Sequence, residues 1–189
     1  MSSSEKPAGV QSPLRNINRF ITTHDDSTGK AIFHNALPDE NQIDSLPSAV
    51  FRLGYVTKEF PPQLNDDKDV NIYKDFLNSP PGLVASGGTV LRMVDVPPNS
   101  TSPMHRTVSL DYGIVLEGEF DLVLDSGEVR RMKRGDIAVQ RGTMHAWRNP
   151  HPTEWGRLMF VLQPCQPVVV GGQELGEDYA GMQGVKPSE

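Results

Sequence analysis

The fold of this protein is decided by one stretch of its sequence, Pro103-Met-His-Arg-Thr-Val-Ser-Leu-Asp-Tyr-Gly-Ile-Val-Leu-Glu-Gly118. Successive side chains of an extended strand point to opposite faces, so every second residue shares a face. His105, Thr107 and Asp111 therefore lie on one side if the backbone runs straight. An imidazole and a carboxylate then point in the same direction from a largely apolar segment.

A second stretch, later in the chain, shows the same alternation, and it reads Gly135-Asp-Ile-Ala-Val-Gln-Arg-Gly-Thr-Met-His-Ala-Trp-Arg-Asn149. His145, Trp147 and Asn149 share a face by the same alternation. If the two stretches meet inside a β-barrel, one imidazole from each enters a common site.

The chain from Gly88 onwards consists of apolar segments of strand length, separated by Gly, Pro and Asp turns. Such spacing is typical of a sandwich or barrel, and Asp125-Ser-Gly127 is the clearest hairpin turn. A composition with 17 Gly, 16 Pro and 37% hydrophobic residues favours short strands over long helices. The sequence therefore predicts an all-β class. The predicted strands of this part are 89–96, 112–116, 119–124, 128–132, 137–140, 145–148 and 157–162.

The chain before Gly88 predicts a hairpin over 19–33, a strand over 49–56 and a short helix over 70–77. Residues 61–81 either form a lid over the barrel or are disordered, and the sequence leaves both open. The first residues hold too few apolar side chains to offset the entropy of ordering. We divide the chain into a mobile N-terminal tail (1–16), N-terminal strands and an insertion packing on the barrel (17–87), the barrel (88–170) and a polar C-terminal tail (171–189).

The first stretch resembles a signature motif of the cupin superfamily, which reads Gly, five residues, His-x-His, three or four residues, Glu, six residues, Gly. His105 matches the first His, Asp111 stands where the Glu belongs, and Gly118 matches the last Gly. The resemblance covers about 88–170. It implies a cupin-type double-stranded β-helix, or jelly-roll barrel, with the N-terminal strands and short helix added.

The second stretch resembles the other cupin motif, Gly, five residues, Pro-x-Gly, two residues, His, three residues, Asn. Gly135, His145 and Asn149 match it, with the spacing one residue short. Two departures concern function. Thr107 stands where the second metal-binding His of the first motif is usual, and Arg141 replaces the Pro of the second.

What remains of the cupin metal site is His105, Asp111 and His145. Two imidazoles and one carboxylate suffice for a divalent metal with open positions, so the resemblance implies a zinc, iron or manganese cofactor held by these three catalytic residues. Two alternatives stay open. In a metal-free enzyme the same groups act as general acid and base, and in a non-catalytic cupin the barrel only binds a small molecule.

The reaction that the resemblance implies is of the lyase or isomerase type, because a Lewis acid suits decarboxylation, dehydration and isomerisation. Dioxygenation would need a redox metal. Stand-alone cupins of this kind resemble members encoded beside enzymes of natural-product biosynthesis. We therefore expect a small carboxylated or polyketide-like aromatic substrate.

Four further residues are candidates for binding that substrate. Thr107 could be a weak oxygen ligand, orient a bound water or only fill space. Trp147 and Asn149 could provide an aromatic wall and a polar anchor; the alternatives are core packing for Trp147 and a turn-stabilising role for Asn149. Arg92 alternates with Val90 and Val94 in a strand, so an outward Arg92 would expose both valines. An inward guanidinium would bind a substrate carboxylate through two hydrogen bonds, whereas an outward one would be solvated.

Charge and composition restrict the partners. A net charge of −6, without a run of Lys and Arg that offers the electrostatic footprint nucleic acid needs, argues against nucleic-acid binding, and no apolar run is long enough to predict a membrane span. The single cysteine, Cys165, cannot form an internal disulfide, which favours a cytoplasmic protein. The strands before Gly88 exceed what one barrel requires, so we also predict a homodimer.

Overall fold

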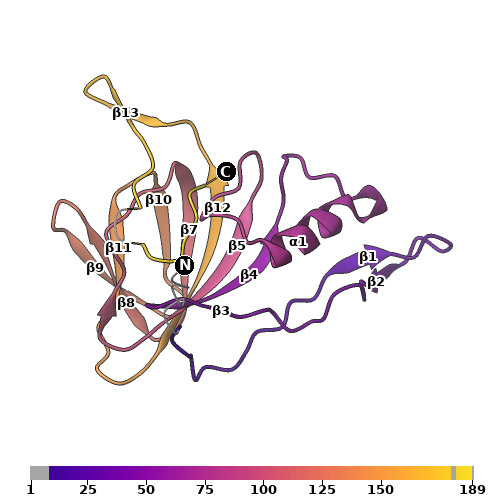
Figure 1. Cartoon of the computed structure of the whole chain (residues 1–189), viewed down its shortest axis with the longest axis horizontal. Coiled ribbons are helices and arrows are strands. Elements are labelled where there is room, and N and C mark those ends of the chain that lie inside the picture. Colours follow the sequence, from indigo (N-terminus) through magenta and orange to yellow (C-terminus); the bar gives the residue numbers. More distant parts are fainter. Residues whose placement is uncertain (1–8, 180–181, 189) are drawn as a thin grey trace, which may run out of the picture.

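The structure is a computed structural model that describes residues 9–179 and 182–188. Its ordered segments are almost all strands, which confirms the predicted all-β class (Figure 1). The larger of two main sheets has six antiparallel strands in the order β10-β7-β12-β5-β4-β3. They are β3 (Asp44–Ser45), β4 (Val50–Val56), β5 (Val90–Val96), β7 (Ser109–Glu117), β10 (Ile137–Arg141) and β12 (Gly156–Pro164).

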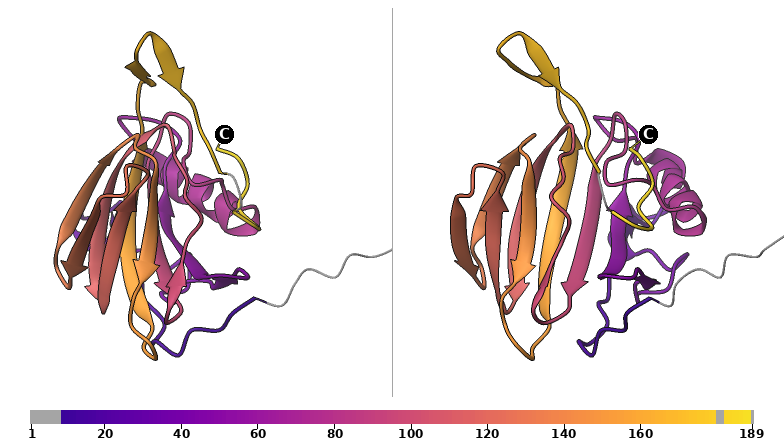
Figure 2. Two further views of the ribbon diagram at one scale, coloured as in Figure 1. Left: turned by 90° about the vertical axis from the view of Figure 1, so that its left-hand side faces the viewer. Right: turned by 60° about the vertical axis from the view of Figure 1, so that its left-hand side comes forward.

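The smaller main sheet has four strands in the order β6-β11-β8-β9. They are β6 (Ser100–Thr101), β8 (Glu119–Leu124), β9 (Val129–Lys133) and β11 (His145–Asn149). Gly127 adopts a φ of +87° in the predicted turn between β8 and β9, a conformation that glycine reaches without steric cost. Figure 2 shows the strands of the two sheets around a common interior.

The interior is filled by side chains that alternate along these strands. Residues of β4 at even positions, such as Val50 and Val56, are buried, while those between them are half-buried. One core cluster joins the two sheets, and it comprises Val96, Val115, Phe120, Met132, Ala138, Trp147 and Leu158. The sequence alternation thus becomes a packed core with one face of each sheet turned inward.

The added N-terminal elements lie at the β3–β4 side of the larger sheet (Figure 1). The predicted hairpin forms from β1 (Thr22–His24) and β2 (Ala31–Phe33) and projects away from the sheets. A 3₁₀ turn, η1 (Asn65–Asp67), leads into the helix α1 (Lys68–Asn78). This helix buries Tyr73 and packs on β4, so residues 61–81 contribute core side chains. In the residues that the structure describes, no helix is long and apolar enough to cross a membrane.

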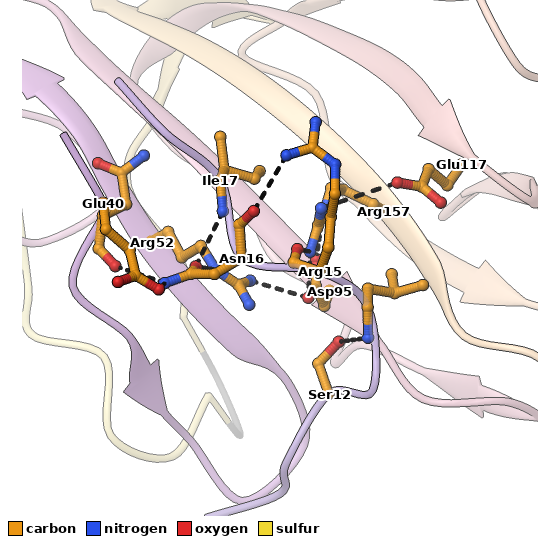
Figure 3. Close-up of polar contacts among 11 residues, drawn as sticks. Ser12, Arg15, Asn16, Ile17, Glu40, Arg52, Asp95, Glu117 and Arg157 are labelled. Carbon is orange, nitrogen blue, oxygen red and sulfur yellow. Dashed lines mark hydrogen bonds and ion pairs between the residues drawn. The ribbon is translucent and has the colours of Figure 1, made fainter. Parts of the chain in front are cut away.

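Residues 9–16 differ from the mobile tail that their composition predicts. Figure 3 shows this segment against the larger sheet, where the side chain of Asn16 accepts a hydrogen bond from Arg52 (2.7 Å). Arg157 donates to the carbonyl of Arg15 (3.0 Å). Polar bonds to buried arginines order the segment, and an argument from apolar content alone does not detect them. Residues 1–8 of the predicted tail lie outside the described residues.

The C-terminal part contains a second small hairpin. Strand β13 (Val168–Val170) pairs with β14 (Gln173–Leu175) of the same chain. The chain then returns to the body, where the Lys186 ammonium donates to the Ser79 hydroxyl (3.1 Å). Lys186 of the polar tail therefore lies against the insertion that precedes the barrel.

Candidate functional site

Two histidines meet at the centre of the site. The backbone of His105 pairs with that of His145, the first residue of β11, through two N–H to carbonyl bonds of 2.9 Å each. Their ring centroids lie 4.3 Å apart. The two sequence motifs thus meet as predicted, one imidazole from each.

Each imidazole is held by a backbone carbonyl. Nδ1 of His105 lies 2.9 Å from the Pro103 carbonyl oxygen, and Nδ1 of His145 lies 2.8 Å from that of Thr143. A carbonyl only accepts hydrogen bonds, so both Nδ1 atoms carry the proton and both Nε2 atoms keep a lone pair. Burial lowers the pKa of His145 to about 3, with a further contribution from His105, and burial also lowers the pKa of His105. Both rings are therefore neutral acceptors at pH 7.

Asp111 lies on β7 and is 3% exposed. The Thr107 hydroxyl donates to its Oδ2 (3.2 Å), and the Ser109 hydroxyl donates to Thr107 (2.5 Å). Its Oδ1 is buried and has no hydrogen-bond partner among the residues that the structure describes. Burial raises the pKa of Asp111 to about 6, against the hydrogen bonds from Ser109 and Thr107, which lower it. The carboxyl therefore exchanges its proton close to neutral pH.

Two more polar side chains at this end are buried without partners. Within residues 9–179 and 182–188, neither the side-chain amide of Gln140 nor the indole N–H of Trp147 has a hydrogen-bond partner. Gln140 is paired directly with Asp111 across β10 and β7. Buried polar groups are normally satisfied, so these atoms fit a site whose ligand completes them. Sequence analysis missed Gln140 because apolar-in alternation over 137–141 turns Ile137 and Val139 inward, whereas the structure buries Ala138 and Gln140.

These polar groups surround one end of a cavity of about 100 Å³. His105, Thr107, Asp111, Gln140 and His145 line it together with Trp147. The remaining walls are mostly apolar, and they include Leu46, Phe51, Leu83, Val94, Leu158, Phe160 and Leu162. A mostly apolar cavity with a few convergent polar groups is the usual form of a small-molecule site.

Of the two directions left open for Arg92, the structure has the inward one, and the side chain lines the same cavity. It is 6% exposed. Its guanidinium donates to the Gly82 carbonyl (2.8 Å) and lies over the Phe51 ring, 5.1 Å from the centroid.

Comparison with known proteins agrees with this geometry. The model of the cupin domain matches residues 92–161. The "Phomopsin biosynthesis cluster protein D" of Diaporthe leptostromiformis is 49% identical over 90% of this chain and 91% of its own length. This chain belongs to the cupin family. The cupin is also 44% identical to the "Oryzines biosynthesis cluster protein J" of Aspergillus oryzae, over 85% of this chain and 90% of that protein.

A third relative of this cupin is the "Cupin-domain-containing oxidoreductase virC" of Hypocrea virens, 46% identical over 83% of this chain and 80% of that protein. The family and the two facing sheets together confirm the predicted cupin-type double-stranded β-helix.

Asn149 does not line the cavity of this cupin. Its side-chain amide donates to the carbonyls of Val96 (3.1 Å) and Glu154 (2.9 Å), and its oxygen accepts from the His151 backbone (3.0 Å). All these bonds go to backbone groups, so Asn149 fastens the loop after β11. The other three predicted substrate-binding residues, Thr107, Arg92 and Trp147, do line the cavity.

The predicted metal ligands of the cupin, His105, Asp111 and His145, do not all come together. Within residues 9–179 and 182–188, no group of three or more His, Cys, Asp or Glu side chains is arranged so that it could hold a metal ion. His105 and His145 suit a metal because each leaves Nε2 free while Nδ1 is anchored. Asp111 is instead bonded to Thr107, the residue at the usual position of the second motif-one His. In the described residues, the Nε2 atoms of His105 and His145 can therefore bind a metal, but the Asp111 carboxylate does not join them.

Proposed function

We propose that this cupin is a lyase or isomerase that transfers a proton to and from a small oxygenated molecule through Asp111. The observation that carries the proposal is the buried carboxyl itself, which has one unpartnered oxygen at the cavity and a pKa of about 6. A base titrating near the working pH combines a large ionised fraction with good proton affinity.

In the proposed reaction, ionised Asp111 takes a proton from a carbon next to a carbonyl group. The electron pair of the C–H bond moves onto the carbonyl oxygen, where the unbonded N–H groups of Gln140 and Trp147 stabilise the negative charge. If the substrate carries a conjugated double bond, the enolate electrons shift along it and Asp111 returns the proton to the γ carbon, which completes an isomerisation. If it carries a β-hydroxyl, the enolate electrons form a C=C bond as the C–O bond breaks, and Asp111 protonates the departing hydroxide to water, which completes a dehydration. The neutral His105 and His145 accept hydrogen bonds from substrate hydroxyls through Nε2.

The names of the relatives guide the choice of substrate. Two are named for the biosynthesis clusters of phomopsin and oryzines, and others are named cupin-domain-containing oxidoreductases. We infer a role in secondary metabolism and an aromatic or polyketide-like substrate. The mostly apolar walls of the cavity support such a molecule.

Phenylpyruvate in D₂O tests the proposal, because its methylene lies beside a carbonyl and exchange is followed by ¹H NMR. We expect wild type to accelerate exchange and Asp111→Asn to reduce the enzymatic rate by about 100-fold or more, the usual contribution of a general base. Asp125→Asn, in the exposed β8–β9 turn, is the matched control and should keep the wild-type rate. Wild type that exchanges no faster than buffer would refute the proposal.

A metal-dependent enzyme is the second candidate, and the free Nε2 atoms of His105 and His145 favour it. It requires Asp111 to leave Thr107 and join the two imidazoles. A metal at that site would supply Lewis-acid or, if redox-active, oxidative chemistry. Metal analysis after reconstitution with iron, manganese and zinc separates the candidates: one equivalent that His105→Ala removes and Thr107→Ala retains supports the metal enzyme, and no bound metal supports the metal-free one.

A further inference from the structure

Three arginines of this protein are almost fully buried, and they differ in their partners. Arg52 and Arg157 both bind the carboxylate of Asp95, with N–O distances of 2.8 Å from each (Figure 3). Arg92 lies on the opposite face of the same sheet, and in the described part of the chain no acidic side chain forms an ion pair with it. Buried charges are normally paired, so Arg92 is the exception.

The contacts of Arg92 leave part of its guanidinium for a ligand. One terminal nitrogen donates to the Gly82 carbonyl, and the flat face lies over Phe51. The side chain lines the cavity of the candidate site and also an adjoining cavity of about 290 Å³. It therefore stands where the two cavities meet, with its orientation fixed by one bond and one ring.

The group stays charged in this position. Burial lowers the pKa of Arg92 to about 10, while Tyr179 and Asp44 act electrostatically in the opposite direction. At neutral pH the cation persists, and the cost of burying it falls when an anion binds beside it.

We propose that Arg92 binds a carboxylate of the substrate and thereby fixes which end of the molecule faces Asp111. This rests on the proposed function, because it names the substrate class of the same cavity. A planar guanidinium with free N–H groups suits the two oxygens of a carboxylate. Apolar neighbours such as Leu46 and Leu83 favour a carboxylate on an apolar body over a strongly hydrated inorganic anion.

The strand register gives the length of that body. Arg92 on β5 pairs with Phe160 on β12, and Phe160 pairs with Gly113 on β7. Asp111 lies two residues before Gly113 on the same strand. With strands about 4.8 Å apart and about 3.4 Å per residue, the Cα atoms of Arg92 and Asp111 are about 12 Å apart. Both side chains reach inward from these positions, so a substrate between them presents its carboxylate to Arg92 and its reacting carbon to Asp111.

Binding of 3-phenylpropanoate and of its uncharged amide, 3-phenylpropanamide, tests the proposal by isothermal titration calorimetry. We expect wild type to prefer the acid, and Arg92→Met to weaken acid binding at least tenfold while leaving amide binding unchanged. Arg141→Met removes the same charge from the exposed face of β10 and should bind both compounds as wild type does. Equal binding of acid and amide by wild type, or undiminished acid binding by Arg92→Met, would overturn the proposal.

Two further variants keep the outcome interpretable. Arg92→Gln removes the charge and retains an amide donor for the Gly82 carbonyl, so it replaces Arg92→Met if that variant does not fold, with the same tenfold loss expected. Asp111→Asn should bind the acid at least as tightly as wild type, since it removes a negative charge. Acid-selective binding without phenylpyruvate exchange would leave the role of Arg92 standing and refute only the proton-transfer function.

Discussion

Replacing Asp111 by Asn changes how the stability of the protein depends on pH. In the fold, burial raises the pKa of this carboxyl from 3.8 to about 6. A raised carboxyl pKa means that the folded state holds the proton more tightly, so the group contributes stability below about pH 4 and loses it as the pH rises through 6. Since one pKa unit corresponds to about 1.4 kcal/mol, the contribution is about 3 kcal/mol. Asn has no such proton to lose.

Urea unfolding followed by tryptophan fluorescence, at several pH values from about 4 to 7, measures this difference. The free energy of unfolding of Asp111→Asn relative to wild type should rise by about 2 to 3 kcal/mol over that range. Asp125→Asn, exposed in its turn, should track wild type throughout. A difference between Asp111→Asn and wild type that does not change with pH would refute the buried, proton-holding state of this carboxyl.

Three further outcomes are expected. Asp95→Asn leaves Arg52 and Arg157 buried without their shared carboxylate, so urea unfolding should show a loss of about 3 to 5 kcal/mol, and an unchanged midpoint would contradict the pairing. Gly113→Ala brings a methyl group within 3.1 Å of the Trp147 ring, so thermal unfolding should show a loss of about 1 to 3 kcal/mol, which unaltered stability would contradict. The predicted homodimer should have a mass of twice 20.8 kDa by size-exclusion chromatography with light scattering, and a mass of 20.8 kDa would contradict it.

The sequence predicts the barrel and the meeting of the two histidines because both depend on local pattern. Alternation assigns the faces of the strands, and the resemblance of the two stretches to the cupin motifs implies that His105 and His145 share a site. Short-range periodicity is sufficient for features of this kind. The direction of Arg92 stays open, because alternation with two valines does not by itself decide which face of the strand is buried.

Other features depend on contacts between distant segments, which one sequence does not reveal. The bond between Thr107 and Asp111 separates the carboxylate from the two imidazoles. The order of residues 9–16 comes from Arg52 and Arg157, far away in the chain. Gln140 was missed because its strand turns the smaller and more polar side chains inward, against the usual preference.

The pH dependence of phenylpyruvate exchange tests the central claim most directly, because it reports the group that removes the proton. After subtraction of the buffer rate, the wild-type rate should rise as Asp111 ionises and level off above a midpoint near pH 6. A midpoint near pH 4, or a rate independent of pH between 4 and 8, would contradict the assignment of Asp111 as the base.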